Sequence, residues 1–177
     1  AAKMAALKVA RGTEDGANIG PMIDEKSRTN IHALVEDAVS KGATVLTGGA
    51  VPAGEGYFYP PTVMTNVSAD ARIMKNEVFG PVAPIITFKD EAEAIALAND
   101  TEFGLVAYAF TKDLNRGLRL AESLEVGMFG LNTGIVSNPA APFGGVKASG
   151  LGREGGKEGI EEYLETVYIG IADPFED

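Results

Sequence analysis

The sequence contains no cysteine and no tryptophan, and it has a single histidine among its 177 residues. Without cysteine, this chain has no disulfide framework, no thiolate metal site and no thiol nucleophile. One histidine leaves little material for a histidine-rich metal site or a Ser-His-Asp triad. We therefore expect no metal centre and no nucleophile of these kinds within the chain.

Positive charge is also scarce, since 15 Lys and Arg residues face 25 Asp and Glu residues, a net charge of −10. This charge repels nucleic acid and anionic membranes. No apolar run approaches the roughly 20 residues of a membrane-spanning helix, and the start of the chain lacks the basic and apolar pattern of a secretory signal. We expect no nucleic-acid or membrane partner and a cytoplasmic location.

What is present is the composition of a globular protein, with 45% hydrophobic and 23% charged residues. A chain of this length can bury about 70% of its unfolded surface in one domain. Residues 1–9 resemble the middle of a helix, because they carry no capping residue. We expect the chain to be a segment cut from a longer one.

One long helix is predicted in the first half of the chain. Asp24 can cap it, and it runs to about Lys41, where Gly42 suits the end of a helix. Apolar residues within it are spaced i, i+3, i+4 and i+7, which predicts one buried stripe. This stripe consists of Ile31, Leu34, Val35 and Ala38.

Three strands accompany this helix. Short strands are expected at 44–46 and 62–66, with an exposed loop rich in Gly and Pro at 48–61 between them. The β-branched run 82–88 predicts another strand. Because that run contains Pro84, which cannot donate to a ladder, it should lie at a sheet edge or a bulge.

The second half of the chain alternates helices and strands. After the strand at 82–88 it predicts, in order, a helix opened by a capping box at Asp90–Glu93 and ending near Asn99, a strand at 105–111, a helix at 113–124 and a strand at 127–131. The order β-α-β-α-β implies parallel strands with right-handed crossovers. The predicted fold class is α/β.

Residues 132–153 form a long irregular segment after the last of these strands. Such a segment is unusual in a compact domain and often functional, and ligands of α/β folds bind beyond the carboxyl ends of strands. A short helix with Ile160, Tyr163 and Leu164 on one face should follow. The alternating residues of Thr166–Ala172 then predict a final strand.

Two motifs carry little information. Gly150-Leu-Gly152-Arg-Glu-Gly155 matches the dinucleotide pattern G-x-G-x-x-G, but it follows no strand and precedes no full βαβ unit, so we interpret it as a turn. His32 lies beside the buried stripe, and no nucleophile or acid pattern surrounds it. We interpret it as a structural helix residue.

The segment Asn76-Glu-Val-Phe-Gly-Pro81 is more informative. In an extended segment Glu77 and Phe79 point the same way. A carboxylate can accept two hydrogen bonds from a diol, and an aromatic ring can cover a flat heterocycle. The alternative is that Glu77 is a solvated loop acid, since acids are rarely buried.

The loop from Asn132 to Lys147 offers polar groups and an apolar wall. Its polar members are Asn132, Thr133, Ser137 and Asn138, and Phe143 supplies the wall. The alternative is a turn-rich connector whose Asn and Ser side chains bond their own backbone. Arg153 and Glu154 are expected at the start of the last helix, where an acid interacts favourably with the helix dipole.

At these residues the sequence resembles the aldehyde dehydrogenase superfamily, over almost its whole length. The matching motifs, in family order, are Gly20-Pro-Met-Ile, Glu77-Val-Phe-Gly-Pro, Phe103-Gly-Leu, Phe110-Thr-Lys-Asp, Asn132 and Pro142-Phe-Gly-Gly-Val-Lys-Ala-Ser-Gly-Leu-Gly-Arg-Glu. Within the superfamily, Gly130-Leu-Asn-Thr-Gly-Ile-Val-Ser-Asn, Lys147-Ala-Ser-Gly-Leu-Gly-Arg-Glu-Gly and Glu158-Gly-Ile-Glu-Glu-Tyr-Leu-Glu most resemble the succinate-semialdehyde dehydrogenases.

The resemblance implies an oxidoreductase that uses NAD or NADP to oxidise a small aldehyde to an acid. Its nucleophilic Cys, its general-base Glu and its Rossmann-type cofactor domain would precede this chain. The chain would then hold the C-terminal part of an incomplete parallel-sheet catalytic domain (1–163) and an oligomerisation strand with its tail (164–177). Without the nucleophile we expect the fragment alone to be inactive, and we expect a homo-oligomer through the C-terminal strand.

The resemblance also implies roles for particular residues. Glu77 would bind the ribose hydroxyls of the nicotinamide nucleotide, and Phe79 would lie beside the nicotinamide. Ser137 would contact the substrate carboxylate, and Phe143 would line the substrate tunnel. Glu154 would be structural with a relay role in proton transfer. One departure is Asn76, where many members carry a second Glu.

Two alternatives remain open. The parent could be another aldehyde dehydrogenase, acting on lactaldehyde or on a semialdehyde of different length. It could also be a non-catalytic assembly module whose last strand pairs with a neighbouring sheet edge.

Overall fold

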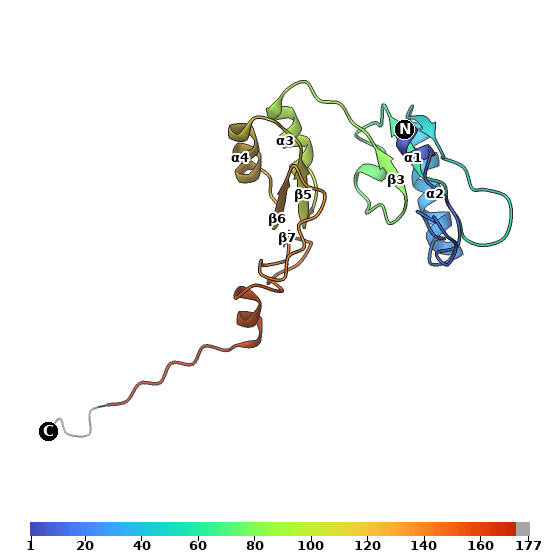
Figure 1. Cartoon of the computed structure of the whole chain (residues 1–177). Helices are drawn as coiled ribbons and strands as arrows, with labels where there is room; N and C mark the ends of the chain where they lie inside the picture. The colour runs from blue at the N-terminus through green and yellow to red at the C-terminus, as the bar shows by residue number, and fades with distance from the viewer. Residues whose placement is uncertain (173–177) are drawn as a thin grey trace. The chain divides into compact units, whose positions relative to one another are not determined.

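The computed structural model describes residues 1–172 and divides into two compact units, Ala1–Phe88 and Lys89–Asp177 (Figure 1). None of the helices within residues 1–172 is both long and apolar enough to cross a membrane.

The first unit packs helices against a three-stranded sheet. Its elements are α1 (Ala2–Ala5), α2 (Glu25–Ser40), β1 (Thr44–Thr47), β2 (Thr62–Thr65), the 3-10 helix η1 (Arg72–Met74) and β3 (Val82–Pro84). The sheet order is β1-β2-β3, with β1 antiparallel and β3 parallel to β2. Pro84 therefore lies in an edge strand, which confirms that expectation. The strand is shorter than the predicted 82–88, and the apolar residues Ile85, Ile86 and Phe88 are exposed.

Helix α2 is capped and buried as its sequence predicts. The Asp24 side chain accepts a hydrogen bond from the Ser27 amide at 2.6 Å, and Gly42 adopts a φ of +97° after the last turn. All four residues of the predicted stripe are buried. Helix α1 is much shorter than the predicted 1–9, because it has no side-chain cap and buries no residue, while Val9 bridges to Ile19.

The core of the first unit includes a residue that the sequence analysis assigned to an exposed loop. Tyr59 has no exposed surface, and its hydroxyl lies 3.2 Å from the His32 Nδ1 atom. Burial raises the pKa of Tyr59 to about 12. The expectation of an exposed loop throughout 48–61 is wrong at this residue, because its ring fills the space beneath α2.

The second unit is built around a parallel strand pair. Its elements are α3 (Glu91–Asn99), β4 (Phe103–Gly104), β5 (Val106–Ala109), α4 (Leu114–Ser123), β6 (Met128–Leu131), β7 (Val146–Lys147) and the 3-10 helix η2 (Glu158–Tyr163). Strands β5 and β6 are parallel and are joined through α4, which confirms the α/β class. The sequence predicted that the strands at 82–88, 105–111 and 127–131 are parallel neighbours. Of these, β5 and β6 pair with each other, whereas β3 pairs with β2 in the first unit.

The segment 132–153 is less irregular than predicted. Within it, β7 pairs antiparallel with β4, and Phe143 forms an isolated bridge to Glu154. The β4–β7 pairing joins residues more than 40 positions apart, so it leaves no local pattern.

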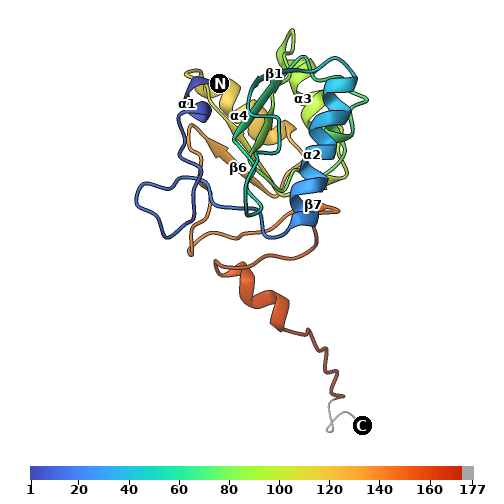
Figure 2. The ribbon, with the colours of Figure 1, turned by 90° about the vertical axis from the view of Figure 1, so that its right-hand side faces the viewer.

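Residues 164–172 form no strand in the single chain, so the strand predicted at Thr166–Ala172 is wrong there. The segment leads away from the rest of the second unit (Figure 2). Val167 and Ile169 are each 76% exposed, and Ile171 is 86% exposed. A strand requires a neighbouring strand for its backbone hydrogen bonds, and none of the described residues provides one.

Helices α3 and α4 are joined by an ionic clamp that should make stability depend on pH. The Glu91 carboxylate accepts hydrogen bonds from Arg119 at 2.8 and 3.0 Å and from Arg116 at 3.1 Å. These guanidinium groups, Arg119 foremost, lower the pKa of Glu91 from 4.5 to about 2. The stabilisation is therefore fully present above pH 4.5 and is lost as the pH falls toward 2.

We expect Glu91→Gln to lower the urea midpoint at pH 7, and this difference should vanish at low pH. The matched control is Glu122→Gln on the exposed face of α4, which should have little effect at either pH. A Glu91→Gln deficit that stayed constant down to pH 2.5 would contradict the clamp.

Candidate functional site

The segment containing Glu77 and Phe79 lies between η1 and β3 and belongs to no helix or strand. Val78 packs against the core of the first unit, whereas Glu77 is exposed and Phe79 is 78% exposed. This alternation agrees with the expectation that Glu77 and Phe79 point the same way, and the exposure of Glu77 also fits the alternative of a solvated loop acid. A phenyl ring so exposed gains little from burial in the chain itself, and it is available to cover a flat ligand.

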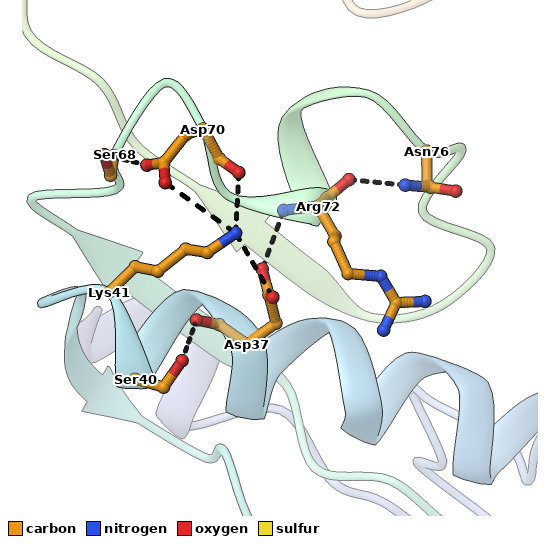
Figure 3. A network of polar contacts seen from close by, with 7 residues as sticks. All are labelled: Asp37, Ser40, Lys41, Ser68, Asp70, Arg72 and Asn76. Carbon is orange, nitrogen blue, oxygen red and sulfur yellow. Dashed lines mark hydrogen bonds and ion pairs between the residues drawn. The ribbon is translucent and has the colours of Figure 1, made fainter.

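The loop that leads into this segment is held by polar contacts from α2 (Figure 3). The Asp37 carboxylate accepts a hydrogen bond from the Arg72 amide at 2.7 Å, and this bond is the main reason that the pKa of Asp37 lies below its usual value. The Lys41 ammonium donates to the Asp70 carbonyl at 2.7 Å and lies 3.3 Å from Asp37. The start of η1 is therefore tied to α2.

Most polar side chains of the 132–145 loop bond nearby backbone. Asn132 has a φ of +55°, accepts from the Thr111 amide at 2.8 Å and donates to the Thr111 carbonyl at 2.9 Å, which extends the β5–β6 pairing by one step. The side chains of Thr133 and Asn138 bond Ile135 and Ala140. The turn-rich alternative is thus confirmed for Thr133 and Asn138, whereas Asn132 bonds the backbone of Thr111, 21 residues earlier.

Ser137 differs from its neighbours in this loop. It is exposed, and its hydroxyl makes no hydrogen bond to any residue within 1–172. Its hydroxyl is therefore available to a ligand, whereas the side chains of its polar neighbours already form hydrogen bonds within the chain.

Phe143 and Glu154 are brought together by reciprocal backbone hydrogen bonds of 2.7 and 2.8 Å. Beside them, the Arg153 guanidinium donates to the carbonyls of Gly145 and Gly152, each at 2.7 Å. Arg153 therefore has a structural role. The last helix begins only at Glu158, so the expectation that Arg153 and Glu154 start it is wrong.

Phe143, at 37% exposure, and Glu154 border an open hollow of about 580 Å³ in the second unit. Its wall also contains Ser149, Arg153, Glu162 and Tyr163. A second open hollow of about 630 Å³ lies at the carboxyl ends of β5 and β6, and Phe110, Lys112 and Asn132 border it. The expectation of open space beyond the ends of parallel strands agrees with this second hollow.

The predicted residues thus fall into two groups within the described chain. Glu77 and Phe79 lie on one extended segment of the first unit, whereas Ser137, Phe143 and Glu154 belong to the second unit. His32 contacts Tyr59 and Glu36, which supports its structural interpretation. The sequence analysis missed Asp37, because its partner lies 35 residues away and no local pattern signals the bond.

The described residues define a class of fold, mixed α/β with parallel strand pairs. The model of the aldehyde dehydrogenase family matches residues 1–169, and the chain belongs to that family. The resemblance stated from the sequence is therefore confirmed.

Two curated relatives are semialdehyde dehydrogenases. The chain is 58% identical over 177 residues to a succinate-semialdehyde dehydrogenase of Paenarthrobacter nicotinovorans, covering all of this chain and 39% of that protein. It is 54% identical over 172 residues to a glutarate-semialdehyde dehydrogenase of Pseudomonas putida, covering 97% of this chain and 35% of that protein. The chain thus spans little more than a third of the curated relatives that it matches.

A solved structure agrees. The crystal structure of an aldehyde dehydrogenase from Brucella melitensis biovar abortus superposes with a TM-score of 0.90 at 56% identity, covering 95% of this chain and 34% of that one. The aldehyde dehydrogenase fold is therefore confirmed for this chain.

Proposed function

We propose that this chain is the C-terminal part of an NAD(P)+-dependent aldehyde dehydrogenase that oxidises succinate semialdehyde to succinate. The observation that carries the proposal is the Glu77–Phe79 segment, anchored by Val78 and exposed on either side of it. The nucleophilic Cys and the general-base Glu would come from the part of the protein outside this chain, which contains no cysteine.

The residues present fit a nicotinamide nucleotide. Within residues 1–172 the Glu77 carboxylate makes no hydrogen bond or ion pair, so both its oxygens can accept from two vicinal ribose hydroxyls. The exposed Phe79 ring can cover the flat nicotinamide. When bound, the nucleotide supplies the hydride acceptor, and Glu77 and Phe79 would bind and orient it.

The substrate proposal rests on Ser137 and Phe143. A small hydroxyl at 137 leaves room for a substrate carboxylate and can donate a hydrogen bond to it. Phe143, partly exposed in its hollow, would form an apolar wall. A relay role for Glu154 remains part of the proposal, with its carboxylate exposed and its backbone holding Phe143.

The 54% identity to a glutarate-semialdehyde dehydrogenase favours a second candidate substrate, one methylene longer. Steady-state kinetics of the full-length protein with succinate semialdehyde, glutarate semialdehyde, lactaldehyde and a neutral aliphatic aldehyde, each with NAD+ and NADP+, would test the proposal. We expect the highest kcat/KM with succinate semialdehyde. A higher value with lactaldehyde or the neutral aldehyde would contradict it.

The chain alone should produce no NADH or NADPH with any of these aldehydes, since it contains no cysteine nucleophile. A stoichiometric burst of reduced nucleotide from the purified chain would contradict the proposal that the nucleophile lies outside this chain. Production of acid by the full-length protein would at the same time rule out the assembly-module alternative.

The proposal includes a homo-oligomer formed through residues 164–172 and a cytoplasmic location. Exposed apolar side chains alternate along this segment, which suits pairing with the sheet edge of a second copy. Light scattering should find at least a dimer of the full-length protein. Deletion from residue 164 onward should reduce the number of subunits in the assembly. A wild-type monomer would contradict this part of the proposal.

A further inference from the structure

The backbone of Arg72 is held on both sides by side chains, one at its amide and one at its carbonyl. The Asp37 carboxylate accepts from its amide at 2.7 Å, and the Asn76 side-chain amide donates to its carbonyl at 2.7 Å (Figure 3). The backbone amides of Lys75 and Asn76 donate to the same carbonyl, at 3.1 and 3.0 Å. The first residue of η1 is thereby fixed to α2 at one end and to the turn after η1 at the other.

Asn76 is also the residue directly before Glu77. Apolar anchors hold the loop on either side of this point, since Ala71 and Ile73 are buried and Val78 packs against the same core. Between these anchors, residues 75–77 are exposed. Apolar packing therefore fixes the ends of the stretch, and the polar contacts of Asn76 set how the chain leaves η1 toward Glu77.

We propose that Asp37 and Asn76 are positioning residues, which act through the Arg72 peptide to aim the Glu77 carboxylate at the ribose. The inference rests on the proposed nucleotide role of Glu77. It follows from the isolation of that side chain, since Glu77 makes no polar side-chain contact of its own within residues 1–172. The backbone therefore fixes the point from which this side chain starts, and a carboxylate that accepts from two hydroxyls needs accurate placement.

Asp37 and Asn76 form different kinds of hydrogen bond, since Asp37 accepts and Asn76 donates. Asp37 needs an acceptor oxygen, because its partner is a backbone amide. Asparagine at position 37 retains that oxygen, whereas alanine removes it. Asn76 needs a donor, because its partner is a carbonyl, so alanine at position 76 removes the contact without adding charge.

The experiment uses the full-length enzyme and measures three quantities for each variant. These are the dissociation constant of NADH or NADPH from the nucleotide's own fluorescence, the KM of the aldehyde, and the melting temperature. We expect Asn76→Ala and Asp37→Ala each to raise the nucleotide dissociation constant about fivefold, as for loss of one hydrogen bond. The aldehyde KM should stay within about twofold of wild type, as for a distant surface substitution. Asp37→Asn should restore most of the nucleotide affinity.

Ser40→Ala is the matched control. The Ser40 hydroxyl donates to the Asp37 carbonyl at 2.7 Å, so this variant removes a bond from the same network without touching the Arg72 peptide (Figure 3). It should leave nucleotide affinity unchanged. If Ser40→Ala weakened nucleotide binding as much as Asn76→Ala does, or if Asp37→Asn were as impaired as Asp37→Ala, the positioning role would be overturned.

A double-mutant cycle separates this inference from the proposed function. If Asn76 acts through Glu77, the Asn76→Ala penalty should disappear when Glu77→Gln is already present. A full penalty in that background overturns positioning and leaves the ribose role of Glu77 intact. If Glu77→Gln alone leaves nucleotide affinity unchanged, the proposed ribose role fails, and the positioning role falls with it.

Discussion

Replacing Glu77 by glutamine in the full-length enzyme is expected to slow hydride transfer by about 10- to 100-fold, as for weakening of charge-assisted hydrogen bonds. Glutamine keeps the size of the side chain but retains only one acceptor oxygen and no charge. The ribose would then lose one of two hydroxyl contacts, and the nicotinamide ring would be less well oriented for transfer. Single-turnover appearance of reduced nucleotide, followed by stopped flow, measures this step directly.

The control for this experiment is Glu55→Gln. Glu55 is also an exposed loop acid in the first unit, so the variant makes the same change in net charge outside the Glu77–Phe79 segment. It should transfer hydride at the wild-type rate. An unchanged rate for Glu77→Gln would refute the ribose assignment, and equal slowing by both variants would indicate a general effect of charge.

Local patterns predicted the helices α2, α3 and α4 well. The caps at Asp24 and Asp90 were predicted from the sequence, and each of these carboxylates accepts a hydrogen bond from an amide three residues ahead. The parallel pair β5–β6 was readable for a similar reason, since the crossover helix α4 stands between the two strands in sequence. In both cases the deciding contacts lie close together along the chain.

The wrong predictions concern residues whose structure depends on contacts with distant parts of the chain. Tyr59 is buried because α2 and β2 meet above a loop whose glycines and prolines predict exposure. Strand β7 forms because β4, more than 40 residues earlier, offers a partner, as the pairing of Phe103 with Lys147 shows. Residues 166–172 have the alternation of a strand but no partner among the described residues, so the pattern alone did not suffice.

In the candidate site, too, the local pattern predicted some features and the long-range contacts left no signal in the sequence. The exposure of Glu77 and Phe79 on either side of Val78 was predictable from the two-residue repeat of an extended segment. The contact from Asp37 to Arg72, which holds the loop before that segment, joins residues 35 apart and left no trace in the sequence. The sequence therefore indicated which side chains are presented, and the structure adds how their backbone is held.

A substitution at Ser137 should have a second large effect on activity. Replacement of Ser137 by phenylalanine in the full-length enzyme should reduce kcat/KM for succinate semialdehyde by about 10- to 100-fold, since a hydrogen bond to a charged group is lost. The added ring would also occupy the space of the substrate carboxylate. A neutral aliphatic aldehyde of similar length has no carboxylate to lose, so its kcat/KM should change much less.

Two further variants separate the causes of this effect. Ser137→Ala keeps the space but removes the donor, so it should show the loss of the hydrogen bond alone. Ile135→Phe adds the same ring two positions earlier, where the side chain is already 74% exposed, and it should leave both aldehydes unaffected. If Ser137→Phe impaired both aldehydes equally, the ring would be blocking a shared passage. In that case the effect would count against a carboxylate role for Ser137, and the preference for a semialdehyde would have to arise from other residues.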